Sequence, residues 1–225
     1  MKILELFKGT GSFGKVCGED DELISVDILK KFKPTHVIDI LEFDYKQYKW
    51  FDMIWTSPPC TEFSVALRCR ERDIEKGMKN VIKSFEIIDY FKQINPNLKW
   101  IMENPQGELR KQPLMKKYKK VDTSYCKYGT PYRKITNFWY DGFDLELLPK
   151  CSKIGGYCKT IIEREKETKS GKKYISRIHE CSLCRGGFEK KEKTGNGIEP
   201  KGCNKKLKYH IPEKLCQSFY NQIKL

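Results

Sequence analysis

Apolar residues along the 225-residue chain gather into short runs, and each run is followed by a loop. Runs of this length that end at glycine, proline or polar residues are typical of strands buried in the middle of a sheet. We therefore predict six strands, at residues 2–7, 22–28, 36–40, 51–57, 98–104 and 135–142.

The segment between the fourth and fifth of these runs has a different spacing of apolar residues. Ile74, Met78, Val81, Phe85 and Ile88 recur at helical spacing and predict one long amphipathic helix. Strands that alternate with helical segments indicate an α/β fold with a mostly parallel sheet. Ligands of such sheets bind at the carboxyl ends of the strands.

The apolar pattern stops after residue 150, and this change sets the predicted domain boundaries. Residues 151–210 carry little periodicity, many lysines and glycines, and five cysteines, which predicts a loop-rich insertion. Periodicity resumes in residues 211–225, where Pro212 suits the first turn of a helix. We expect residues 1–150 to form the main domain and the last helix to pack back on its sheet.

Basic residues are concentrated in the same insertion. The formal net charge is +14, yet residues 1–150 contain 26 Lys and Arg against 22 Asp and Glu. Residues 151–210 contain 16 against 7. Such a surplus on one module is typical of a protein that binds a polyanion such as DNA, although a solvated lysine-rich loop gives the same count.

Chain length and cysteine content further restrict which class of protein this is. No run approaches the roughly 20 apolar residues that a membrane span needs, and the first residues do not match a signal peptide. We expect a soluble, intracellular monomer without membrane contact. Ten cysteines in a chain this long favour metal binding or thiol chemistry over a disulfide scaffold.

Glycines and acids follow the first three predicted strands. Gly9, Gly11 and Gly14 have the G-x-G-x-x-G spacing that lets a ligand approach the backbone closely. Asp27 and Asp39 end the next two strands, where carboxylates can accept hydrogen bonds from ribose hydroxyls and an adenine amino group. Each aspartate alone also suits a helix cap or a turn. Together with the glycine loop they predict a nucleoside pocket.

The fourth strand ends in the sequence SPPC, residues 57–60. Two prolines fix two successive φ angles and remove two backbone donors, so the side chain that follows is held still. Cys60 is therefore a candidate nucleophile. The fifth strand ends in ENP, which places Glu103 at the neighbouring strand end.

The motifs LFKGTG, SPPCTEFS and MENP, in this order and at these strand ends, resemble those of the DNA cytosine-5 methyltransferases, especially small viral and phage members. The resemblance covers about residues 3–140. It implies a Rossmann-like sheet that binds S-adenosylmethionine, double-stranded DNA as partner and a flipped cytosine as substrate. For a viral protein it implies the host cytoplasm or nucleus. It also implies cofactor contacts from Phe7, Gly9, Gly11, Asp27, Ile28, Asp39, Ile40 and Pro58.

The resemblance assigns catalytic roles to four residues. Cys60 would add to C6 of cytosine, and Glu103 would hold N3 and the exocyclic amine through a carboxyl that burial lets exist protonated. Pro59 would shape the turn and offer its carbonyl to the base. Arg133, in YGTPYRKITNFW, would contact the base and lower the pKa of the cysteine.

Three alternatives stay open. Methyltransferases that act on exocyclic amines carry an aromatic residue after S-P-P or N-P-P and need no thiol. The cysteine at position 60 of this chain therefore favours methylation of carbon over methylation of an amine. The substrate could be RNA instead of DNA. The protein could also be a catalytically silent binder of nucleic acid, since the chain has no clear counterpart of the family's long target-recognition region.

Half of the ten cysteines lie in residues 151–210. Cys181 and Cys184 have the C-x-x-C spacing that suits tetrahedral zinc, and Cys151 and Cys158 form a looser pair. We predict a structural zinc ion held by these four, against scattered reduced thiols in a flexible basic loop. Alternatives for one ligand are His179, Cys203 and His210. Thiols that suit ordinary packing or surface positions are Cys17, Cys69, Cys126 and Cys216.

Overall fold

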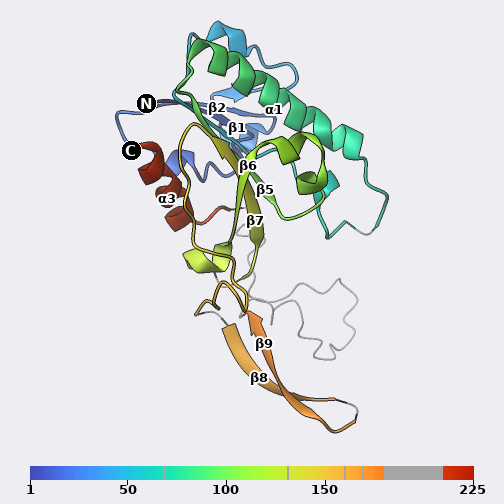
Figure 1. Ribbon diagram of the computed structural model, residues 1–225. Coiled ribbons are helices and arrows are strands. Elements are labelled where there is room, and N and C mark those ends of the chain that lie inside the picture. The colour runs from blue at the N-terminus through green and yellow to red at the C-terminus, as the bar shows by residue number, and fades with distance from the viewer. Residues whose placement is uncertain (68, 131, 160, 169, 180–209) are drawn as a thin grey trace.

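The computed structural model describes the chain except residues 68, 131, 160, 169 and 180–209 (Figure 1). Within this part, seven strands form one sheet with the order β3-β2-β1-β4-β5-β7-β6, and two more strands form a separate hairpin. The strands of the sheet are β1 (Lys2–Leu6), β2 (Glu22–Asp27), β3 (His36–Val37), β4 (Met53–Thr56), β5 (Lys99–Pro105), β6 (Lys119–Ser124) and β7 (Ile135–Asp141).

Strands β1 to β5 run parallel, and β7 runs antiparallel to both of its neighbours, β5 and β6. In the centre, Leu4 of β1 lies opposite Ile54 of β4, which in turn lies opposite Trp100 of β5. The mostly parallel α/β class predicted from the sequence is therefore confirmed. Because β1, β4 and β5 are neighbours, their carboxyl ends meet at one edge of the sheet.

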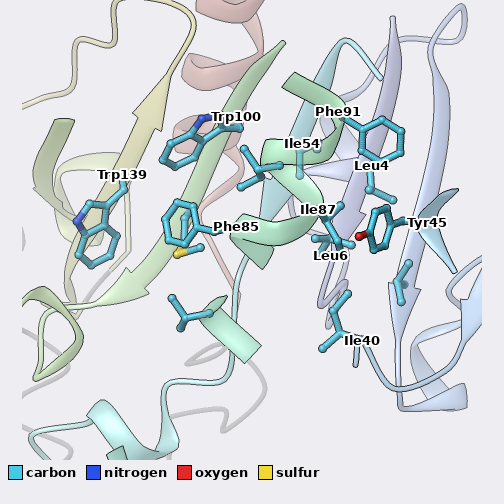
Figure 2. Packing of buried hydrophobic residues seen from close by; sticks show 14 of the residues in the cluster. Leu4, Leu6, Ile40, Tyr45, Ile54, Phe85, Ile87, Phe91, Trp100 and Trp139 are labelled. Atoms are coloured by element: carbon cyan, nitrogen blue, oxygen red, sulfur yellow. The ribbon is translucent and has the colours of Figure 1, made fainter. Parts of the chain in front are cut away.

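The long helix α1 (Ile74–Ile94) covers one face of the sheet (Figure 1). Its first turn is capped by Asp73, whose carboxylate accepts a hydrogen bond from the backbone N–H of Lys76 at 2.9 Å. Figure 2 shows the side chains buried beneath the helix, where Phe85 meets Trp100 edge to face at 5.5 Å between ring centroids. Burial of this apolar face holds the helix on the sheet.

The other face of the sheet is covered by the C-terminal helix α3 (Glu213–Ile223) (Figure 1). Its apolar stripe includes Phe219, which contacts Trp55 and Phe138 at centroid distances of 5.4 and 4.8 Å. Side chains alternate along each strand, so Trp55 faces α3 while its neighbour Ile54 faces α1. Among the described residues, no helix is long and apolar enough to cross a membrane.

The described chain departs from the predicted pattern in the connections between the first four strands. These are loops with short 3-10 turns instead of α-helices. The segment that follows β1, KGTGSFGK, shows the reason, since it is rich in glycine and lysine and lacks an apolar repeat.

A hairpin formed by β8 (Ile161–Glu167) and β9 (Lys173–His179) lies within the segment predicted to be loop-rich. Figure 1 shows it extending away from the sheet. Gly171 closes its turn with φ +80°, and Arg177 Nε donates to Glu163 Oε1 across the strands at 2.8 Å. Its strands alternate charged residues with few apolar ones, which is why the hydrophobic pattern alone does not reveal them.

Candidate active site

A cavity of about 260 Å³ lies where the carboxyl ends of β1, β4 and β5 meet. The residues that line it come from the glycine loop after β1, from the Pro-Pro turn after β4, from the end of β5 and from the segments beside β7 and α3. They are Glu5, Phe7, Lys8, Gly9, Thr10, Ser12, Phe13, Trp55, Ser57, Pro58, Pro59, Cys60, Thr61, Glu103, Pro105, Lys134 and Ile211.

The glycine loop turns sharply above β1. Gly9 and Gly11 have φ values of +50° and +64°, a region that glycine enters without steric cost. Phe7 has φ +57°, which is strained for an aromatic residue and is the kind of strain found at ligand sites. The backbone N–H of Gly9 donates to Asp27 Oδ2 at 2.8 Å, so the end of β2 holds the loop in place.

Glu5, in β1, is the most buried acid of the pocket, with a relative exposure of 1%. Its Oε1 accepts a hydrogen bond from the backbone N–H of Gly14 at 3.3 Å, while Oε2 has no hydrogen-bond partner among the described residues. Burial raises the pKa of Glu5 to about 7. An unpartnered buried oxygen of this kind fits a ligand that brings a cationic or hydrogen-bond-donating group.

The Pro-Pro turn is held from two sides. Trp55 Nε1 donates to Ser57 Oγ at 3.0 Å, and Asn104 Nδ2 of β5 donates to the carbonyl of Pro58 at 2.9 Å. Cys60 follows these anchors and precedes the short 3-10 turn Thr61–Phe63. The thiol is therefore presented to the cavity by a turn that cannot easily rearrange.

Burial and two charged groups determine whether the thiol of Cys60 is ionised. Burial raises the pKa of Cys60, the carboxyl of Glu103 raises it further, and the ammonium of Lys134 opposes both. The Nζ of Lys134 lies 3.9 Å from Glu103 Oε1. The resting thiol is therefore protonated, and a shift of the Lys134 charge toward the sulfur would favour the thiolate.

Glu103 is held by a buried tyrosine. Tyr125 Oη donates to Glu103 Oε1 at 3.1 Å, and burial followed by the charge of Glu103 raises the pKa of Tyr125 well above its usual range, so the hydroxyl stays a donor. The ammonium of Lys134 lies over the ring of the same tyrosine at 4.7 Å. A nucleophile, a positioned carboxyl and a cation thus share one pocket, whose wall includes the stacked rings of Phe13 and Trp55.

A second cluster of reactive side chains lies outside this pocket. The sulfur atoms of Cys126, Cys151 and Cys158 all lie within 4.8 Å of one another. Two of the four predicted zinc ligands, Cys151 and Cys158, are therefore together. The other two, Cys181 and Cys184, lie outside the described residues, and their participation stays a prediction, as it does for the alternatives His179 and Cys203. The third alternative, His210, contacts the glycine loop, where its Nδ1 lies 3.1 Å from Thr10 Oγ1 and 3.0 Å from Ser12 Oγ.

Comparison with known proteins agrees with the chemistry of the pocket. The family model for C-5 cytosine-specific DNA methylases matches residues 1–123. The chain belongs to this family. A probable DNA (cytosine-5)-methyltransferase of Frog virus 3 (isolate Goorha) is 31% identical over 159 residues, which cover 63% of this chain and 71% of the viral protein.

Among solved structures of proteins, the S. pombe Dnmt2 methyltransferase resembles this chain with a TM-score of 0.45 and 16% identity. The match covers 65% of this chain and 53% of that one, so this chain spans about half the length of that solved structure.

The structure brings six of the predicted site residues into the cavity wall: Phe7, Gly9, Pro58, Pro59, Cys60 and Glu103. Gly11, two residues beyond Gly9 in the same loop, is not among the residues that line the cavity. Arg133 is exposed and is not among the residues that line the cavity. Its predicted contact with the base stays a prediction.

The four remaining predicted cofactor residues, Asp27, Ile28, Asp39 and Ile40, lie at the end of β2 and in the turn after β3. Asp27 Oδ1 and Asp39 Oδ1 accept backbone hydrogen bonds from Leu29 and Leu41 at 2.8 and 2.9 Å, so each aspartate shapes a turn. Both carboxylates keep further capacity to accept. Ile28 is 62% exposed, whereas Ile40 is 4% exposed and packs in the core. Their cofactor contacts stay predictions.

Three residues of the site were missed by sequence reasoning: Glu5, Asn104 and Lys134. Glu5 lies in the strand that leads into LFKGTG, and Asn104 lies in ENP, so both are close to or within motifs that the sequence analysis used. A polar side chain in a run that is expected to be buried is the signal that could have singled them out. Lys134 has no such signal, because only the register of β7 shows that position 134 and not 133 faces the pocket.

Proposed function

We propose that this protein transfers a methyl group from S-adenosylmethionine to carbon 5 of cytosine in double-stranded DNA through a covalent adduct with Cys60. The observation that carries the proposal is that Cys60 and Glu103 line the same cavity as the glycine loop. Family membership supports the reaction class, and the geometry supports the division of roles among the residues.

The cavity wall fits the cofactor in two respects. The unpartnered Oε2 of Glu5 suits the ammonium of the methionine portion, and the left-handed backbone at Gly9 lets a ligand approach the main chain. Residues that would hold the cofactor are Glu5, Phe7, Gly9, Gly11, Asp27, Ile28, Asp39, Ile40 and Pro58. When bound, S-adenosylmethionine supplies an electrophilic methyl group on a sulfonium.

The residues around the thiol would activate the base. Carbon 5 of cytosine is a weak nucleophile. The Cys60 thiol would therefore give its proton to water and add to C6 as the thiolate while Glu103 delivers a proton to N3, and the ring becomes an enamine that is nucleophilic at C5. After methylation, water takes the C5 proton, the Cys60 thiolate leaves C6, and the N3 proton returns to Glu103, which restores the aromatic ring. Lys134 stabilises the thiolate at both stages.

Basic residues of the segment after residue 150 supply the proposed contact with DNA. Residues 151–210 carry 16 Lys and Arg against 7 Asp and Glu. In the described hairpin, the side chains of Lys166, Lys172 and Lys173 are exposed. An exposed basic hairpin suits phosphate contacts, which position a duplex without reading its sequence.

A measurement of product identity tests the proposal. Purified protein is incubated with methyl-labelled S-adenosylmethionine and with duplex DNA of random sequence or with tRNA, and the nucleosides are separated by mass spectrometry. The proposal requires 5-methyldeoxycytidine from the duplex. Methyl label in tRNA alone would show that the substrate is RNA. Formation of N4-methyldeoxycytidine would overturn the covalent route. Absence of label from both substrates would indicate a catalytically silent protein that binds nucleic acid.

We predict that cofactor affinity depends on the ionisation of Glu5. The pKa of Glu5 is raised to about 7, and an ammonium binds the ionised form better, so affinity should rise roughly eightfold from about pH 6 to about pH 7.5. Glu5→Gln should bind more weakly at the higher pH and lose this dependence. Isothermal titration calorimetry measures both, with the exposed Glu22→Gln as the matched control. The same pH dependence in Glu5→Gln would place the ammonium elsewhere.

We also predict that the hairpin contributes to the salt dependence of DNA binding. Replacing Lys172 and Lys173 with glutamine should weaken binding and make the slope of log affinity against log salt shallower by about 0.9 for each phosphate that the hairpin no longer neutralises. The matched control replaces Lys76 and Lys79, two exposed lysines of α1, with glutamine. Fluorescence anisotropy at several salt concentrations measures the slope. An equal change in both variants would contradict a specific role for the hairpin.

A further inference from the structure

The cluster of Cys126, Cys151 and Cys158 joins two parts of the chain that are distant in sequence. Cys126 lies in the short 3-10 turn Tyr125–Tyr128 that follows β6 of the catalytic sheet, whereas the other two lie in the segment after residue 150. Cys126 is 4% exposed and Cys151 is 1% exposed. The sulfurs of Cys151 and Cys158 are 3.6 Å apart, and the backbone N–H of Cys158 donates to Cys151 Sγ at 3.4 Å.

These distances match a shared metal ion and not a disulfide. Sulfur atoms bound to one tetrahedral zinc at about 2.3 Å lie about 3.8 Å apart, whereas a disulfide needs about 2.05 Å. An N–H group that donates to a sulfur is also the kind of contact that supports a metal-bound thiolate.

We propose that Cys126, Cys151 and Cys158 are three ligands of one structural zinc ion that ties the catalytic sheet to the basic segment. Thiolate ligands at this spacing favour zinc over hard cations such as magnesium or calcium. Binding requires loss of the thiol protons, so affinity rises with pH. The inference does not depend on the identity of the methylated substrate.

The position of the ion gives it a role in the active site. Tyr125, adjacent to Cys126 in the same turn, donates the hydrogen bond that holds Glu103. Other bonds bridge the same two segments, because Cys151 N–H donates to Ser124 Oγ at 3.1 Å and Lys127 Nζ donates to the carbonyl of Gly155 at 2.9 Å. The ion would therefore fix the turn that positions the catalytic carboxyl, although it touches no substrate.

Metal analysis and differential alkylation of the 225-residue chain test the site. The protein is purified under reducing conditions without chelators, and elemental analysis should find about one zinc per chain. Cobalt exchanged into the site should give the thiolate charge-transfer band and the visible d–d bands of a tetrahedral complex. Iodoacetamide labelling mapped by mass spectrometry should modify Cys126, Cys151 and Cys158 together only after a chelator removes the metal.

Two controls separate metal ligation from general unfolding. Cys216, on the buried face of α3, should stay unlabelled after chelation, and Cys69→Ser, at an exposed position, should keep its zinc. Cys126→Ser should lose at least about nine tenths of the zinc. Full zinc content in Cys126→Ser would overturn the proposal. So would protection of Cys126 after complete metal removal, absence of metal from the wild-type protein, or a Cys151–Cys158 disulfide.

Discussion

Replacing Cys60 with alanine is expected to reduce the rate of cytosine methylation by about 10⁴-fold or more, the scale of losing a catalytic nucleophile. Without the thiolate, C5 of the bound cytosine has no route to the enamine and stays a weak nucleophile. The turn that carries residue 60 is anchored through Ser57 and Pro58, so the substitution should leave the pocket in place. Single-turnover assays with saturating DNA measure the loss directly.

The matched control for this prediction is Cys69→Ser, which changes an exposed thiol nine positions further along the chain. It should methylate DNA at the wild-type rate. Cofactor affinity should stay within about threefold of the wild-type value in Cys60→Ala, because the substitution removes an interaction made only in the transition state. A Cys60→Ala protein that retains a tenth of the wild-type rate would contradict nucleophilic catalysis by this residue.

The second large effect is expected from Glu103→Gln. This substitution keeps the shape of the side chain and an oxygen that can accept from Tyr125, but it removes the carboxyl that exchanges a proton with N3. Loss of a positioned acid or base typically costs about 10² to 10⁴ in rate, so kcat should fall by that factor. The measurement is a comparison of kcat and of the cofactor dissociation constant in the two proteins.

Glu108→Gln provides the control, because Glu108 follows β5 closely and pairs with Lys111 outside the pocket. It should be almost neutral. A weak effect of Glu103→Gln, comparable with that of Glu108→Gln, would show that the carboxyl of Glu103 only fills space. A loss of cofactor binding as severe as the loss of kcat would instead indicate that the pocket collapses without the charge.

The central sheet was predictable from the sequence because its strands are buried on both faces. A run such as MIWT in β4 carries apolar side chains toward α1 and α3 alike, so it stands out from the polar loops on either side. The motifs that follow such strands were found for the same reason. A parallel sheet brings consecutive strand ends together, and Cys60 and Glu103 therefore meet in space although 43 positions separate them.

Strand β6 was not predicted because its burial depends on polar side chains. Thr123 and Ser124 are fully buried, and Thr123 Oγ1 donates to the carbonyl of Leu148. A strand of sequence KKVDTS has a single large apolar residue, Val121, and gives no hydrophobic run. Hydrogen bonds to a distant segment, which the local sequence cannot reveal, replace the missing apolar pattern.

The choice between Arg133 and Lys134 shows a second limit of prediction from the sequence alone. Adjacent residues beside a strand point to opposite faces, so a shift of one position exchanges the side chain in the pocket for the one in solvent. The pairing of Ser124 with Ile135 fixes this register, and β6 was not among the predicted strands. Cys126 resembles a packing thiol in the sequence for a related reason, since its cluster forms only when the turn after β6 meets residues 151 and 158.

The most direct test of the covalent mechanism uses duplex DNA in which 5-fluorocytosine replaces cytosine. Fluorine cannot leave C5 as a proton does, so the adduct formed after methyl transfer is trapped. We predict a denaturation-resistant complex that forms only with S-adenosylmethionine, that maps by mass spectrometry to Cys60, and that is absent from Cys60→Ser. Equal trapping by Cys60→Ser, or methylation of ordinary DNA with no trapped complex at all, would contradict it.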